Sequence, residues 1–217
     1  MLGIPTSQRV ALLIDADNIQ LTQISHILRF SSYFGGQIIQ RAYGDWLQPP
    51  LLSHKEHLDT LKIKRIQVDR VGKDSTDKQL MIEAGELLGG GTANLFVIVS
   101  GDGDFTQLCE RIQKKKRTVV GIGHKAISSP YLQDACDSFY YVEELPGFIA
   151  QLKLESLLQE AYLQVKQPDG RAHLGQLGQV LRKLDPKYEH HFGKKLSKWI
   201  DNNPHIFKRH NNYVSRL

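Results

Sequence analysis

Apolar residues fall into short runs that alternate with segments of helical spacing. The clearest runs contain Val, Ile and Leu without polar alternation, which is typical of parallel strands buried on both faces. The pattern predicts strands at residues 10–14, 37–43, 63–68, 95–99, 118–122 and 139–142. It predicts helices at residues 22–30, 54–61, 76–88, 105–114 and 130–135. Strands that alternate with helices through short connections indicate an α/β fold, with helices on both faces of a parallel sheet.

Two of the predicted strands end in acidic turns. The first strand leads into Asp15-Ala16-Asp17-Asn18, and the fourth leads into Ser100-Gly101-Asp102-Gly103-Asp104. A doubly wound strand order of 3-2-1-4-5 would place these two strands side by side, where the order reverses. Open α/β sheets bind ligands beyond the carboxyl ends of their strands at this point. We therefore expect Asp15 and Asp102 to project into one acidic crevice.

The helix predicted at residues 76–88 begins near a further group of acids. It follows Lys73-Asp74-Ser75-Thr76, in which Ser or Thr can cap the exposed backbone N–H groups. Asp77 falls in the first turn of this helix, and Lys73 is a candidate for contact with a phosphate group. Asp17 and Asp74 add two more acids to this region.

Carboxylates held close together repel one another, which raises their pKa values unless a cation neutralises them. Mg²⁺ and Mn²⁺ prefer oxygen ligands and keep water molecules for a substrate, so we expect one of these ions. Such an ion can activate water and stabilise the charge on a phosphodiester while it is cut. The candidate metal ligands and catalytic residues are Asp15, Asp77, Asp102 and Asp104, with Asn18 orienting a ligand or phosphate. The alternative is that Asp77 and Asp104 only cap helices, as acids in a first turn often do.

The C-terminal third of the chain has a different pattern. Helical spacing is found at residues 154–165, 174–184 and 196–200, followed by candidate strands at 206–209 and 213–217. Three helices followed by a hairpin form a winged-helix plan, which is common in nucleic-acid binding. Pro146-Gly147 lies at the expected junction, so we predict domains at residues 1–145 and 146–217.

The net charge of +5 is unevenly distributed along the chain. Residues 151–217 contain 12 Lys and Arg against 6 Asp and Glu, whereas residues 1–150 contain 16 against 17. A basic C-terminal module beside a slightly acidic body suggests a polyanion-binding appendage; a solvated basic surface is the alternative. The candidate phosphate-contacting residues in this module are Arg182, Lys183, Lys187, Lys194, Lys195 and Lys198.

Cysteine content and hydropathy bear on the cellular compartment. Cys109 and Cys136 form no paired ligand motif, so neither a disulfide framework nor a zinc ribbon is expected. No apolar segment approaches the roughly 20 residues that span a bilayer. The chain also passes from Met1 almost directly into a core strand, without a visible signal peptide. We expect a cytoplasmic protein without membrane association.

Several motifs of residues 9–145 resemble those of the NYN family of PIN-like nucleases, in its LabA-like branch. They are Asp15-x-x-Asn18, Gly72-Lys73 followed by Asp77, Ser100-Gly101-Asp102-x-Asp104-Phe105, Gly121-Ile122-Gly123 and Asp134-Ala135-Cys136-Asp137-Ser138-Phe139. The resemblance implies a PIN-like α/β fold and metal-dependent cleavage of RNA. It also implies that the same four aspartates, Asp15, Asp77, Asp102 and Asp104, carry the activity.

Residues 150–217 resemble the OST-HTH domain, also called LOTUS. The similar segments are Leu157-Leu158, Leu174-Gly175, Leu177-Gly178, Leu184-Asp185-Pro186, Phe192-Gly193-x-Lys195-Leu196 and Tyr213-Val214. This resemblance implies a module that grips RNA, which we expect to be single-stranded, and that can also recruit a protein partner.

Two other functions compete with a ribonuclease. Asp15-Ala16-Asp17 resembles the nucleophile motif of haloacid-dehalogenase phosphatases, but Asp102 and Asp104 are too closely spaced for the later acidic pair of that family. The second rival is a non-catalytic RNA-binding adaptor whose acids hold a structural ion. A nuclease accounts for the acidic crevice and the basic C-terminal module together.

Overall fold

The computed structural model of the chain describes residues 8–69, 74–193 and 195–217. The chain divides into two compact units, of which the larger ends at Pro146 and the smaller comprises Gly147–Leu217. Each unit has its own buried apolar cluster.

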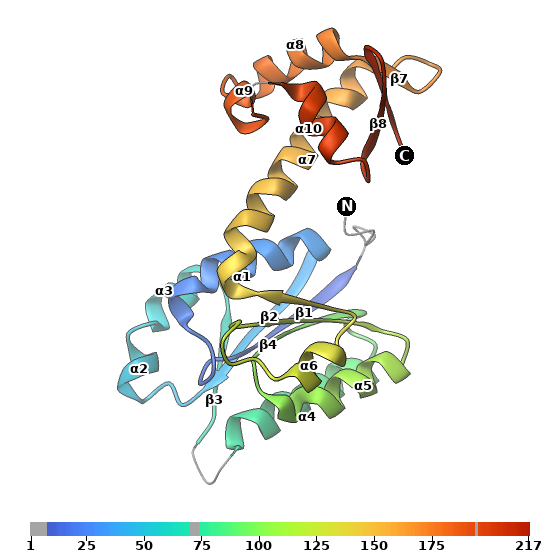
Figure 1. Cartoon of the computed structure of the whole chain (residues 1–217). Helices are drawn as coiled ribbons and strands as arrows, with labels where there is room; N and C mark the ends of the chain where they lie inside the picture. The colour runs from blue at the N-terminus through green and yellow to red at the C-terminus, as the bar shows by residue number, and fades with distance from the viewer. Residues whose placement is uncertain (1–7, 70–73, 194) are drawn as a thin grey trace. The chain divides into compact units, whose positions relative to one another are not determined.

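The larger unit is built on a parallel sheet. Within the described residues the sheet has six strands in the order β3-β2-β1-β4-β5-β6, and every neighbouring pair is parallel (Figure 1). The strands are β1 (Arg9–Asp15), β2 (Gln37–Gly44), β3 (Lys64–Gln67), β4 (Leu95–Val99), β5 (Thr118–Gly123) and β6 (Ser138–Tyr141). The predicted order 3-2-1-4-5 is confirmed, and β6 extends the sheet beyond β5.

Helices cover both faces of this sheet, with α1 on one face and α4, α5 and α6 on the other (Figure 1). The α-helices are α1 (Ile24–Ser31), α2 (Pro49–Leu52), α3 (Lys55–Thr60), α4 (Ser75–Gly89), α5 (Thr106–Lys114) and α6 (Pro130–Asp134). Short 3₁₀ turns are η1 (Leu21–Gln23), η2 (Ser32–Phe34), η3 (Gly103–Phe105) and η4 (Val142–Glu144). Alternation along β1 sends Ala11 and Leu13 into the cluster that includes Leu80 of α4 and Leu108 of α5. This burial fixes where the strand ends lie.

The smaller unit has winged-helix element order: a helix, a short strand, three helices and a hairpin. Its elements are α7 (Leu145–Val165), which begins in the larger unit, β7 (Arg171–His173), α8 (Leu174–Leu184), α9 (Tyr188–His191), α10 (Leu196–Asn202), β8 (Phe207–His210) and β9 (Tyr213–Arg216). The three strands form an antiparallel sheet in the order β7-β9-β8. Its core gathers apolar residues of all four helices with Phe207 and Val214 of the hairpin.

Two elements of the smaller unit are absent from the sequence prediction. β7 has only three residues, and it forms by pairing with β9 about forty residues later, so local periodicity does not reveal it. α9 is a single turn whose Tyr188 packs into the core together with Phe192, which follows it. In both cases distant contacts decide the structure.

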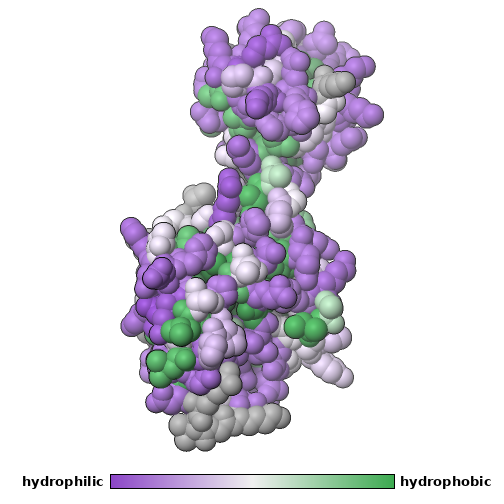
Figure 2. Space-filling view, turned by 90° about the vertical axis from the view of Figure 1, so that its left-hand side faces the viewer, coloured by the Kyte–Doolittle hydropathy of each residue, from purple (hydrophilic) through white to green (hydrophobic). Residues whose placement is uncertain are grey.

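Much of the face shown in Figure 2 is hydrophilic, and the apolar side chains on it form separate patches. Scattered exposed apolar residues of this kind are normal for a protein surface. No helix in the described part of the chain has the length and hydropathy needed to cross a membrane.

Gly121 of β5 is a point where the larger unit tolerates no side chain. A Cβ atom added there would lie 2.3 Å from Cδ2 of Phe139 and 2.8 Å from Sγ of Cys136. We expect Gly121→Ala to lower the free energy of unfolding by about 1–3 kcal/mol, because the packed ring has to move. Urea denaturation followed by circular dichroism would measure the change.

Gly89→Ala provides the matched control, because a Cβ atom at the last residue of α4 meets nothing within 4 Å. This variant should match the wild type or gain up to about 1 kcal/mol from the better helix propensity of alanine. Equal denaturation midpoints for the two variants would contradict the packing described around Gly121.

Candidate active site

The pairing of β1 with β4 brings two polar strand ends together. Ile14 is opposite Val99 in the register, so Asp15 and Ser100 emerge side by side at the carboxyl edge of the sheet. Oδ2 of Asp15 accepts hydrogen bonds from Oγ of Ser100 at 2.9 Å and from Nδ2 of Asn18 at 2.6 Å. The structure thus places Asp15 and Asn18 in direct contact at this edge.

The second carboxylate oxygen of Asp15 lies in an unfavourable environment. The residue is fully buried, and its Oδ1 has no hydrogen-bond partner among the described residues. Burial raises the pKa of Asp15, against the lowering effect of the hydrogen bonds from Asn18 and Ser100. A buried carboxylate oxygen without a partner costs free energy, which a cation would recover.

Asp77 is the meeting point of the acidic residues. It lies in the first turn of α4, and it is buried. Burial, together with the nearby negative charges of Asp15, Asp102, Asp74 and Asp104, raises the pKa of Asp77 to about 6. Asp77 is therefore close enough to be repelled by the other three predicted aspartates and by Asp74.

The tightest cluster consists of Asp74, Asp77 and Asp104, whose carboxylate oxygens lie within 4.8 Å of one another. This spacing suits one divalent cation bound by hard oxygen ligands. Asp74 was not among the predicted ligands, and Asp15 and Asp102 lie outside this triad although their charges act on Asp77. The sequence feature that could have identified Asp74 as a ligand is its position directly before the first turn of the helix.

The acids at the start of α4 do not act as simple helix caps. Asp74 occupies the cap position with a left-handed φ of 63°, and no side-chain cap hydrogen bond is formed there. The expectation that Ser or Thr caps this helix is wrong in this respect. Oγ1 of Thr76 instead donates to Oδ2 of Asp17 at 2.7 Å, which ties α4 to the turn after β1.

Asp102 and Ser100 together shape the turn after β4. Oδ1 of Asp102 accepts from the backbone N–H of Asp104 at 2.9 Å, so Asp102 caps η3. The backbone N–H of Asp102 donates to Oγ of Ser100 at 3.1 Å, while the same hydroxyl donates to Asp15. Ser100 therefore joins the two acidic turns, a role that the sequence analysis did not predict. The sequence feature that points to it is a polar residue directly after an apolar strand.

These residues surround an open cavity of about 340 Å³. Its lining residues are Asp17, Asn18, Asp74, Ser75, Thr76, Asp77 and Asp102. Carboxylate oxygens dominate its chemistry, as expected for a site that holds a divalent cation and a phosphate. Lys73, the predicted phosphate contact of this region, lies outside the described residues.

The predicted phosphate-binding residues of the smaller unit lie on its surface. Arg182 and Lys183 end α8, Lys187 precedes α9, and Lys195 and Lys198 lie at the start of α10; all five are exposed. Lys194 lies outside the described residues. Arg182 forms an ion pair with Glu189, so the other four carry more of the charge available to a polyanion.

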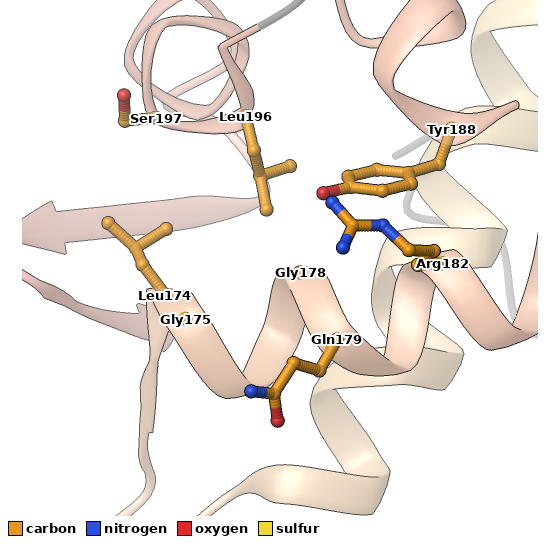
Figure 3. Close-up of a pocket in the computed structure, with 8 residues that line it drawn as sticks. All are labelled: Leu174, Gly175, Gly178, Gln179, Arg182, Tyr188, Leu196 and Ser197. Atoms are coloured by element: carbon orange, nitrogen blue, oxygen red, sulfur yellow. The ribbon is translucent and has the colours of Figure 1, made fainter. Parts of the chain in front are cut away.

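A cavity of about 380 Å³ opens between α8 and α10 in the same unit. Figure 3 shows Arg182 beside the ring of Tyr188 on one side of it, with Leu174 and Leu196 on the other. The guanidinium carbon of Arg182 lies 5.9 Å from the centre of the Tyr188 ring, a cation–π distance. The cavity combines a cation, an aromatic ring and apolar walls next to the exposed lysines.

The parallel sheet with its flanking helices, and the acidic cavity at the carboxyl end of the central strands, fit a PIN-like α/β fold. The family model of the NYN domain matches residues 9–144, and the chain belongs to this family. NYN domains form a family of PIN-like nuclease domains, and the match covers the larger unit.

Solved structures add information on the fold alone. A crystal structure of a protein of unknown function from Vibrio parahaemolyticus is similar, with a TM-score of 0.53 and 20% sequence identity. The similarity covers 66% of this chain and 98% of that chain. A crystal structure described as a "putative oxidoreductase" from Parabacteroides merdae matches with a TM-score of 0.36 and 12% sequence identity. This match covers 72% of this chain and 36% of that chain, and its low TM-score supports no inference. No curated protein matches the chain.

The repulsion between the crowded acids predicts that the folded chain is destabilised at neutral pH when no divalent ion is bound. The pKa of Asp77 is about 6 in the folded chain, above its ordinary value of 3.8, so wild-type stability falls as the pH rises from about 4 through 6. In a chelator at pH 7, Asp77→Asn should therefore raise the free energy of unfolding by about 1–2 kcal/mol, after solvent screening is allowed for.

This gain should shrink as the pH falls toward 4, where the wild-type carboxyl group is protonated. Urea denaturation at several pH values measures it, with Asp134→Asn as control, because Asp134 is an exposed residue of α6. A gain that stays constant between pH 4 and 7 would show that charge repulsion at Asp77 is not its cause.

Proposed function

We propose that the protein is a metal-dependent ribonuclease that cuts RNA phosphodiester bonds at the aspartate cluster of the larger unit. The observation that carries this proposal is the triad of Asp74, Asp77 and Asp104 oxygens, together with the buried Oδ1 of Asp15, which has no hydrogen-bond partner among the described residues. The cluster lies inside an NYN domain, a family of PIN-like nucleases. Together these features favour a nuclease over the phosphatase interpretation.

The donor set fits Mg²⁺ or Mn²⁺, which prefer carboxylate oxygens and retain water. We assign Asp15, Asp77, Asp102 and Asp104 to metal binding, with Asp74 as an additional ligand supported by its place in the triad. When bound, the ion would activate water and stabilise charge on the phosphodiester. Asn18 holds Oδ2 of Asp15 and lines the cavity, so it is placed to orient a phosphate.

The smaller unit supplies affinity for RNA in this proposal, as an OST-HTH (LOTUS) module. Its winged-helix element order and the exposed Lys183, Lys187, Lys195 and Lys198 support this assignment. We further propose that the larger unit belongs to the LabA-like branch, that the substrate is single-stranded RNA and that the protein acts in the cytoplasm. A module of this kind could also recruit a protein partner.

The proposal predicts cleavage of labelled single-stranded RNA in Mg²⁺ or Mn²⁺ and none in chelator. Asp15→Asn and Asp104→Asn keep the size of each side chain but remove the charge that holds the cation. Each should lower the cleavage rate by about 100-fold or more, since the lost group stabilises the transition state. Asp134→Asn should cleave at the wild-type rate. Full activity in chelator would contradict the metal-dependent mechanism.

Thermal denaturation with Mn²⁺ separates binding of the ion from catalysis. An ion that binds only the folded chain stabilises it by about 2.7 kcal/mol at a hundredfold excess over its Kd. Asp15→Asn and Asp104→Asn should gain less than the wild type from Mn²⁺. A protein that binds Mn²⁺ and RNA but never cuts would instead be an adaptor with a structural ion.

The assignment of phosphate contacts to the smaller unit predicts a change in the salt dependence of RNA binding. Each phosphate contact with a single strand contributes a slope of about 0.7 in a plot of log affinity against log salt. We expect Lys195→Gln and Lys198→Gln each to reduce the slope by about this amount in the full chain, measured by fluorescence anisotropy. Lys115→Gln, just after α5 in the larger unit, is the charge-matched control. An unchanged slope in both test variants would place the phosphate contacts elsewhere.

A further inference from the structure

The cavity between α8 and α10 has a wall that lacks side chains at two positions. Gly175 and Gly178 both line it, and because they are three positions apart on α8 they share one face of the helix. Glycine in the middle of a helix is destabilising relative to alanine. A Cβ atom at Gly178 would lie 3.4 Å from Oη of Tyr188, so a larger side chain there would extend into the cavity. The glycines therefore keep open a space that most residues would fill.

Arg182 is held in one orientation at the edge of this space. Its Nη2 donates to Oε1 of Glu189 at 2.5 Å, and the hydroxyl group of Tyr188 donates to the same oxygen at 3.2 Å. The shared carboxylate thus holds the guanidinium group beside the Tyr188 ring (Figure 3). The Arg182 side chain is nevertheless 65% exposed. A planar cation is therefore fixed in position and still accessible to a ligand.

The remaining walls combine apolar and uncharged polar groups. Leu174 and Leu196 provide the apolar surface, while Gln179 of α8 and Ser197 of α10 provide polar groups. An amide and a hydroxyl group can each donate and accept hydrogen bonds. They suit the polar edge of any nucleobase and do not select one base over another.

The charge around the cavity favours a polyanion. No acid is found among its lining residues within the described part of the chain, in contrast to the cavity of the larger unit. Lys183 lies on α8, and Lys195 and Lys198 flank the two residues of α10 that line the cavity; all three lysines are exposed. A nucleotide in the cavity would have lysines on both helices for the phosphates of the neighbouring positions.

The size and chemistry of the cavity fit one unpaired base. Its volume of about 380 Å³ is at the lower end of the range for small-molecule sites. Bases stack on guanidinium planes as well as on aromatic rings. In a duplex every base is already stacked and paired, so only a base from a single strand, a loop or a bulge can enter such a site.

We propose that this cavity binds one unpaired base of RNA, which stacks on the guanidinium group of Arg182 while the exposed lysines of α8 and α10 contact the phosphates beside it. The proposal rests on the RNA-binding role proposed for the smaller unit and adds to it a contact with a base. Every base has a flat face, so we expect this site to bind an unpaired base without sequence preference.

The test measures binding of two single strands of equal length and charge to the full chain by fluorescence anisotropy, in chelator to prevent cleavage. One strand is a labelled oligouridylate, and the other has the same ribose–phosphate backbone without bases. Wild-type protein should bind the oligouridylate about 5-fold or more tightly, because the abasic strand cannot stack. Arg182→Lys keeps the charge but removes the planar group. It should weaken binding of the oligouridylate about 5-fold and leave binding of the abasic strand unchanged.

Arg171→Lys is the matched control. Arg171 also pairs with a carboxylate, that of Asp169, and its guanidinium group also lies over an aromatic ring, that of Tyr213. It does not line the cavity, so this variant should bind both strands as the wild type does.

A second variant blocks the cavity from the opposite wall. Gly178→Leu should weaken binding of the oligouridylate without affecting the abasic strand. Gly89→Leu adds the same side chain where a Cβ atom meets nothing within 4 Å, and it should change neither affinity. Circular dichroism checks that both variants keep the helix content of the wild type.

Equal affinity of the wild type for the two strands, or an equal loss for both strands in Arg182→Lys, would overturn the base site while leaving phosphate binding intact. Cavity variants that bind the oligouridylate as tightly as the wild type would also overturn it, and would leave the cavity to another ligand, such as a side chain of a protein partner. If the wild type binds neither strand, the RNA-binding role of the smaller unit is refuted, and the base site with it.

Discussion

The pairing of β1 with β4 at the centre of the sheet is the constraint on which the acidic site depends. Parallel pairing brings both carboxyl ends to one edge, so Asp15 and Ser100 have to meet there. The strand interiors that enforce this pairing are buried aliphatic side chains, each of which contributes roughly 1.5–3 kcal/mol. A few such residues offset the repulsion between carboxylates that the same pairing creates.

That repulsion has two possible forms of relief. Protonation is one, but a pKa of about 6 leaves Asp77 largely ionised at neutral pH. A bound cation is the other, and the oxygens of Asp74, Asp77 and Asp104 are spaced to accept one. Oδ1 of Asp15 also lacks a partner among the described residues, because the hydrogen bonds from Ser100 and Asn18 both go to Oδ2. The donor chemistry of the site thus favours a divalent cation over a neutral ligand.

The sequence predicted what local pattern and strand order control. Buried strands have a continuous apolar pattern, and the predicted doubly wound order, which the structure confirms, brings the carboxyl ends of β1 and β4 to one edge of the sheet. Contacts between distant residues were not predictable in this way. β7 exists through its pairing with β9, and Asp74 joins the triad because α4 carries its first turn to the edge of the sheet. The role of Ser100 likewise depends on a neighbour 85 positions away.

The phosphate contacts proposed for the smaller unit carry no information on base sequence. Lysines of the smaller unit would act on phosphates, whose charge is the same at every position of an RNA. Strong binding therefore does not imply base preference in this chain, because phosphate contacts strengthen the binding of every sequence alike.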